Sequence, residues 1–140
     1  MKTIITNVEA LRMTIKTKDF HPGTDPKLLC TCNHELCDKR SVRQSVLDRT
    51  QKGRDIINRP LNTRSGGRCQ YHPDELHRTT PADHQKRNGI DLGCNGGLER
   101  GELVKVGIEV GFNAIGVGKT FVHWGYRPEL AEGEVVMWKY

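Results

Sequence analysis

The sequence has no long hydrophobic run. None of its apolar stretches approaches the roughly 20 residues that a membrane-spanning helix needs, so we expect no membrane partner. Near the N-terminus, Glu9 and Arg12 interrupt a short apolar patch before it reaches the length of a leader's hydrophobic region. We therefore expect no signal peptide. We expect the protein to be made in the cytoplasm and, if it acts outside the cell, to leave by a route that uses no cleaved leader.

Aromatic residues are also scarce, at 6% of the chain, and neither sign of charge is gathered into a block. The net charge is +5, from 22 Lys and Arg against 17 Asp and Glu. A basic surface favours an anionic partner, which could be nucleic acid, an anionic lipid or the anionic polymer of a cell wall. Because the cations are scattered and the sequence has no recognition-helix or base-stacking motif, we do not expect nucleic acid.

The chain has the length and composition of a single globular domain. Its 140 residues are 35% hydrophobic and 28% charged, which suits one core formed by residues 1–140. Residues 1–40 are expected to form an N-terminal arm, extended or a short strand over 1–19, followed by an irregular cysteine-rich loop. No internal repeat or linker divides the rest of the chain.

The spacing of apolar residues predicts both helices and strands. Near-helical spacing predicts one helix from Ser41 to the residues before Pro60 and a second over 98–110. Strands are expected at 61–68, 88–94, 114–117 and 120–126, followed by a tail. This order predicts an α+β fold with a small, mostly antiparallel sheet and flanking helices.

Five cysteines make an odd number, which argues against a fully paired disulfide framework. Cys30, Cys32 and Cys37 fall within eight residues of one another, while Cys69 and Cys94 lie further along the chain. Thiolates hold closed tetrahedral zinc sites well, so Cys30, Cys32, Cys37 and Cys69 could bind a structural metal. Buried free thiols, with one disulfide formed late, are the other interpretation, and the spacing leaves both open.

His84, Asp91 and His123 form a candidate metal site of a different kind. Two imidazoles and one carboxylate suit Zn²⁺, and three protein ligands leave a coordination position open for water or substrate. A metal with such an open position can generate a nucleophile at neutral pH. By spacing alone, His123 could equally be a half-buried strand histidine and Asp91 the cap of a turn.

Four segments of the chain carry a family resemblance. Residues 65–72 (SGGRCQYH) are similar to an SGYRCPxHN block, and residues 82–91 (ADHQKRNGID) to an SxHxxGxAxD block. Residues 114–123 (AIGVGKTFVH) are similar to a GIGxY…FVHxD block, and residues 30–32 (CTC) to a CxC motif. In this order the four resemble the zinc D-Ala-D-Ala carboxypeptidase and murein endopeptidase family, especially its phage-type members.

The resemblance implies a fold, a cofactor and roles for individual residues. It implies a D-Ala-D-Ala carboxypeptidase (Hedgehog/DD-peptidase)-like domain in which His84, Asp91 and His123 bind Zn²⁺. Arg68 would face the substrate, where its fork suits a carboxylate or a carbonyl oxygen that gains charge. His72 would orient substrate. The activity implied is hydrolysis of peptide bonds in peptidoglycan stem peptides by a phage-encoded metallopeptidase, made in the host cytoplasm and acting at the cell wall.

The chain departs from the family pattern where a general base is expected. The family carries an acid either three residues before the last histidine or two after it, and these positions are Thr120 and Gly125 here. Asp83, beside a ligand, is a candidate substitute. Three acids of the tail are further candidates: Glu129, Glu132 and Glu134. If none of them acts, the alternative is a structural or binding protein of a phage particle that keeps the fold and metal and contacts other virion proteins.

Overall fold

The computed structural model describes residues 14–140, so most of the expected arm over 1–19 lies outside the described residues. The elements, in chain order, are η1 (Pro26–Leu28), α2 (Gln44–Ile57), β1 (Asn62–Ser65), β2 (Gly89–Gly93), α3 (Gly96–Glu109), β3 (Ala114–Val117), β4 (Phe121–Gly125) and β5 (Val136–Lys139). No helix of the described part is long and apolar enough to cross a membrane.

The five strands form one sheet in the order β1-β2-β4-β3-β5. The pairings β1–β2, β2–β4 and β3–β4 are antiparallel, whereas β5 runs parallel to β3 at the edge. The predicted α+β class, with a small and mostly antiparallel sheet, is therefore confirmed. The prediction that a tail follows residue 126 is wrong in part, because this segment contributes the fifth strand, β5.

Strict alternation along the strands gives the sheet two different faces. One face is apolar and buried: Ile90, Leu92, Ile115, Val122 and Trp124 have no exposed surface. The residues between them, which include Asp91 on β2 and His123 on β4, point to the opposite face. The apolar core and the polar site therefore lie on opposite faces of the same sheet.

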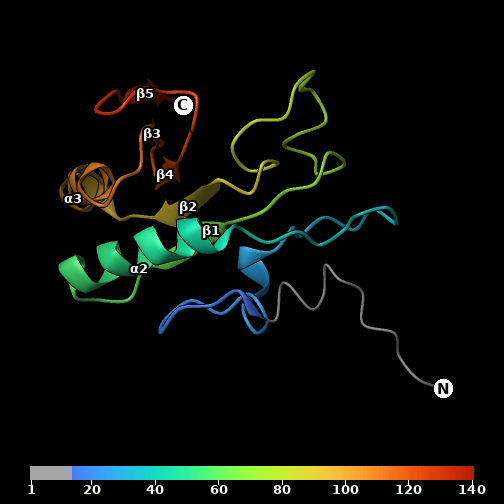
Figure 1. Cartoon of the computed structure of the whole chain (residues 1–140), viewed down its shortest axis with the longest axis horizontal. Coiled ribbons are helices and arrows are strands. Elements are labelled where there is room, and N and C mark those ends of the chain that lie inside the picture. Colours follow the sequence, from blue (N-terminus) through green and yellow to red (C-terminus); the bar gives the residue numbers. More distant parts are fainter. Residues whose placement is uncertain (1–13) are drawn as a thin grey trace.

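The helices α2 and α3 cover the apolar face (Figure 1). Trp124 lies at their junction, where its Nε1 donates a hydrogen bond to the carbonyl oxygen of Leu103 at 2.8 Å. A Cβ added to Gly53 of α2 or Gly107 of α3 would collide with the Trp124 ring. These two glycines let both helices approach the sheet closely, which explains why a helix-weakening residue stands at Gly107.

Candidate metal centre

A row of residues crosses the polar face of the sheet from strand to strand. Asp91 of β2 lies directly opposite His123 of β4. The same row continues from His123 to Gly116 of β3, and from Gly116 to Trp138 of β5. Directly opposite residues in a sheet bring their side chains together, so the pairing alone places a carboxylate beside an imidazole.

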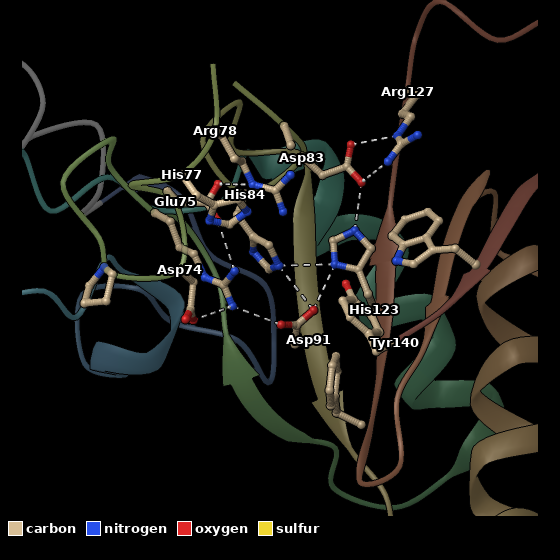
Figure 2. Close-up of a pocket in the computed structure, with 15 residues that line it drawn as sticks. Asp74, Glu75, His77, Arg78, Asp83, His84, Asp91, His123, Arg127 and Tyr140 are labelled. Atoms are coloured by element: carbon tan, nitrogen blue, oxygen red, sulfur yellow. Dashed lines mark hydrogen bonds and ion pairs between the residues drawn. The ribbon is translucent and has the colours of Figure 1, made fainter. Parts of the chain in front are cut away.

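His84 joins this pair from the long loop between β1 and β2. Its Nδ1 lies 2.7 Å from the carbonyl oxygen of Gly66. A carbonyl oxygen can only accept, so Nδ1 carries the proton and Nε2 keeps its lone pair. That Nε2 points to Asp91 Oδ1 at 3.2 Å and to His123 Nδ1 at 3.2 Å (Figure 2).

His123 is oriented in the same way, by a carboxylate instead of a carbonyl. Its Nε2 lies 2.8 Å from Asp83 Oδ2, and Arg127 Nε donates to Asp83 Oδ1 at 3.0 Å. The opposite ring nitrogen, Nδ1, lies 2.8 Å from Asp91 Oδ1. A histidine that binds a metal through one nitrogen commonly donates through the other to a carboxylate, and Asp83 is placed for that role.

Two glycines make room for Asp83 above the sheet. Gly89 and Gly125 face each other across β2 and β4. A Cβ on Gly125 would lie 2.6 Å from Asp83 Oδ2, and one on Gly89 would lie 2.6 Å from Cε1 of His123. Larger residues at either position would displace the carboxylate or the imidazole.

The donor set fits a small divalent cation. His84 Nε2, His123 Nδ1 and Asp91 Oδ1 are separated by 2.8–3.2 Å. Zinc–nitrogen and zinc–oxygen bonds of about 2.0–2.1 Å in a tetrahedral site place neighbouring donors about 3.3 Å apart. The three donors converge, and the three residues are all buried.

The charges of these groups are strongly coupled. Burial raises the pKa of Asp91, but the close contacts with the His123 and His84 rings outweigh it and hold the pKa well below the ordinary value. Burial lowers the pKa of His123, and the contacts with Asp83 and Asp91 reverse this, so the net pKa is raised. The carboxylates of Asp83 and Asp91 therefore stabilise a positive charge between them, and either a proton or a metal ion can supply it.

Arg68 lies against the centre and is held by the protein on every side. Its Nη2 donates to Asp91 Oδ2 at 3.2 Å, its Nη1 to Glu75 Oε2 at 3.3 Å, and its Nε to Ser65 Oγ at 3.0 Å. Its side chain is 12% exposed, and Asp74 lies 3.7 Å away as a further ion pair. Arg68 thus links the carboxylate of the candidate ligand Asp91 to a buried glutamate.

Glu75 is one of several site residues that the sequence did not indicate. Its side chain is 1% exposed, accepts hydrogen bonds from Arg68 and Gln85, and forms an ion pair with Arg78. No motif marks it, because a glutamate in a polar loop usually faces solvent. Trp138 was also missed as a site residue, since its place depends on the unpredicted strand β5.

The three donors line the floor of an open cavity of about 580 Å³ (Figure 2). Its other walls carry arginines, rings and acids: Arg68, Asp74, Glu75, His77, Arg78, Asp83, Phe121, Arg127, Trp138 and Tyr140. Arg127 lies over the Trp138 ring at 4.9 Å, and that ring is 5.4 Å from the His123 ring. Gly116 lets the Trp138 ring pack this close to the sheet, because a Cβ at position 116 would lie 2.8 Å from that ring.

The remaining predicted residues lie in different places. His72 is not among the residues that line this cavity; it lines a neighbouring hollow beside Cys32, and its Nδ1 accepts from the backbone N–H of Asp74 at 3.1 Å. The tail acids do not line the cavity either and are exposed: Glu129, Glu132 and Glu134. Thr120 is exposed. Asp83 lines the cavity with its carboxylate on the side of the His123 ring away from Asp91.

The candidate cysteine ligands also converge. Cys30, Cys32, Cys37 and Cys69 form a second group of side chains that could hold a metal, separate from His84, Asp91 and His123. All five cysteines are free, and Cys94 lies elsewhere, buried in the main core.

No protein-family model, curated protein or solved structure matches this chain in sequence or fold comparisons.

Proposed function

We propose that this chain is a zinc-dependent peptidase that hydrolyses peptide bonds in peptidoglycan stem peptides. The observation that carries the proposal is the convergence of His84 Nε2, His123 Nδ1 and Asp91 Oδ1 within 3.2 Å of one another, on the floor of an open cavity. Two imidazoles and a carboxylate are the ligand set of catalytic zinc sites that keep a position open. Zinc held in this way activates water and polarises a carbonyl oxygen.

The protein's own groups are arranged to hold such a site. Gly66 and Asp83 orient the two imidazoles, so that both ring nitrogens facing the cavity present lone pairs when a metal is bound. Asp83 is already engaged with His123 and Arg127, so we assign it a positioning role instead of the general-base role considered from the sequence. Arg68 holds the second oxygen of Asp91 and lines the same cavity, so its guanidinium would oppose the charge that develops on a reacting carbonyl oxygen.

The walls of the cavity suit an anionic peptide. Arg78 and Arg127 bring positive charge to its rim, with side chains that are 38% and 32% exposed. Trp138 and Tyr140 add rings against which a peptide can pack. Peptidoglycan stem peptides carry free carboxylates, which guanidinium groups bind in a bidentate manner.

The resemblance of four segments to the D-Ala-D-Ala carboxypeptidase and murein endopeptidase family supports the same function. The segments 65–72, 82–91 and 114–123 supply Arg68 and all three candidate ligands. We accordingly propose a Hedgehog/DD-peptidase-like domain, encoded by a phage or prophage, that acts at the host cell wall.

One observation favours a second function, that of a virion structural or binding protein that no longer cuts. Besides the candidate ligand Asp91, three acids line the cavity: Asp83 is bound by His123 and Arg127, Glu75 by Arg68 and Arg78, and Asp74 is an ion-pair partner of Arg68 at 3.7 Å. Each of these three carboxylates is therefore already paired with an arginine. Loss of a general base typically costs about 10²–10⁴-fold in rate, which leaves a weak enzyme or none.

The test is hydrolysis of defined muropeptides by the zinc-loaded protein, read as newly formed amino groups and located by mass spectrometry. We expect cleavage that EDTA stops, that added zinc restores, and that His123→Ala abolishes. His21→Ala, which removes an exposed histidine, is the matched control and should retain full activity. The mass of each product identifies the bond that is cut.

Two results would count against the proposal in different ways. Cleavage that persists after complete zinc removal would refute the metal mechanism. Zinc binding at His84, Asp91 and His123 without cleavage of any muropeptide, together with co-sedimentation of the chain with purified virions, would favour the structural role.

A further inference from the structure

Four of the five cysteines meet at a second place in the molecule. Cys30, Cys32 and Cys37 lie on the loop that follows η1, and Cys69 follows Arg68 on the long loop after β1. All four Sγ atoms lie within 4.8 Å of one another. Cys30, Cys32 and Cys69 are buried, and Cys37 is half-buried at the outer side of the group.

The spacing of the sulfur atoms suits a metal and not a disulfide. Cys69 Sγ lies 3.7 Å from Cys30 Sγ and 3.4 Å from Cys32 Sγ. A disulfide brings two sulfurs to about 2.05 Å. Four thiolates at about 2.3 Å from a tetrahedral zinc ion are about 3.8 Å apart. The observed separations are close to the edges of such a tetrahedron.

Each sulfur also accepts a hydrogen bond from a backbone N–H. Cys30 Sγ accepts from Cys69 at 3.3 Å, and Cys37 Sγ accepts from Lys39 at 3.3 Å. Cys32 accepts from the N–H of His34 and Cys69 from that of Tyr71. Three of these N–H groups belong to the residue two positions after the cysteine whose sulfur accepts the bond. Donors aimed at every sulfur stabilise thiolate charge, as they do around metal–thiolate centres.

Positive side chains stand beside the group. Lys39 Nζ donates to the carbonyl oxygen of Cys32 at 2.6 Å. Arg40 is close enough to Cys30 and Cys69 for these thiols to raise its pKa, after the larger effect of Asp38. Four thiolates around one divalent cation leave a net charge of about −2, which these cations offset.

We propose that Cys30, Cys32, Cys37 and Cys69 bind one zinc ion in a closed, structural site. Each thiol releases its proton to solvent as the sulfur binds the metal, so uptake releases protons. With four sulfur ligands no coordination position stays open for substrate or water, which separates this site from the one at His84.

The position of the site gives it a role. It ties the loop over 30–40 to the segment that begins at Cys69, directly after Arg68. The ring of His34 stacks on that of Tyr71 at 4.0 Å and 5°, which continues the same link. Metal at the cysteines therefore holds the segment that carries Arg68 against the rest of the domain, without touching the substrate.

The test uses the reduced, full-length chain loaded with Co²⁺ or zinc. We expect an intense sulfur-to-cobalt charge-transfer band in the near ultraviolet, and about two zinc ions per chain when both sites are filled. The double variant His84→Ala/His123→Ala should keep the band and about one zinc ion. Cys32→Ser/Cys37→Ser should lose the band, whereas Cys94→Ser, which changes a buried cysteine of the main core, should leave it unchanged.

A second measurement covers the case in which the cysteine variants do not fold. Peptide mapping after brief alkylation of the unaltered chain should show Cys30, Cys32, Cys37 and Cys69 protected with metal and modified after chelation. An absent sulfur-to-cobalt band, or an intact mass that is lower by two hydrogens and reveals a disulfide in the native chain, overturns the proposal. Because the readout is metal at sulfur, it is independent of whether the chain cleaves any peptide.

Discussion

The carboxylate of Asp83 occupies the space beside His123 that a side chain on Gly125 would need. A Cβ on Gly125 would lie 2.6 Å from Asp83 Oδ2 and 2.7 Å from His123 Nε2. The acid that contacts His123 comes from the loop between β1 and β2. Gly125 on β4 has no side chain and so leaves room for this carboxylate.

This arrangement predicts that Asp83 tunes metal binding through His123. Asp83→Asn keeps the size of the side chain but removes the charge that supports the imidazole, so zinc affinity should fall about 10–100-fold. Competition with a chromophoric chelator measures the change. Asp48→Asn, which alters an exposed acid on α2, should bind zinc like the unaltered chain.

Gly125→Ala tests the same contact from the strand. The added methyl group would crowd both Asp83 and His123, so zinc affinity should fall here too. Because both changes act through one ring, the double variant should lose less affinity than the sum of the two single losses. Fully additive losses, or an Asp83→Asn variant with unaltered affinity, would show that Asp83 does not act through His123.

A second prediction concerns the buried glutamate that the sequence did not indicate. Glu75→Gln removes the charge that faces Arg68 and Arg78. Arg68, whose side chain is 12% exposed, then loses one of its anionic partners. Breaking a buried ion pair on one side costs about 3 kcal/mol of unfolding free energy, which urea denaturation can measure. Glu102→Gln, at a surface pair with Arg59, is the control, and its loss should stay below about 1 kcal/mol. Equal losses in the two variants would contradict a buried role for Glu75.

Much of the fold was predictable because local patterns match the final structure. The helix expected before Pro60 and the strand at 114–117 are confirmed by α2 and β3. Gly111 ends the second helix with φ +103, as a C-terminal cap should. The fifth strand was missed because four half-exposed residues at a sheet edge carry no alternation strong enough to distinguish them from a tail.

The candidate site was predictable only in its motif-bearing part. His84, Asp91 and His123 were found through spacing and resemblance, and the structure brings them together. Glu75, Arg127 and the aromatic wall depend on how a long loop and an edge strand fold over the sheet. Such contacts link residues that are distant in sequence, and composition or periodicity carries no signal for them.

A third prediction uses two glycines of α3 as a matched pair. Gly107→Ala would push a methyl group into the Trp124 ring, whereas nothing lies within 4 Å of a methyl group at Gly101. Alanine is favoured over glycine in a helix by about 1 kcal/mol, so Gly101→Ala should stabilise the protein by up to that amount. Gly107→Ala should destabilise it by about 1–3 kcal/mol in spite of the same propensity gain. Thermal unfolding compares the two directly, and stabilisation by both changes would show that the helix–sheet contact at Trp124 is looser than the structure has it.

The last prediction concerns the aromatic wall formed by β5. Trp138 packs against the His123 ring and contacts the Arg127 guanidinium, so it shapes the cavity without supplying a metal ligand. Trp138→Ala should leave zinc affinity within about twofold and weaken muropeptide binding about tenfold, the effect expected from losing one ring contact worth about 1.5 kcal/mol. Calorimetric binding to the zinc-loaded protein measures this without requiring turnover, so the test holds for a peptidase and for an inert relative. Met137→Ala is the control, because the exposed Met137 side chain points to the other side of the strand. If Trp138→Ala bound the peptide as tightly as the unaltered chain, the cavity above His123 would not be the peptide-binding surface.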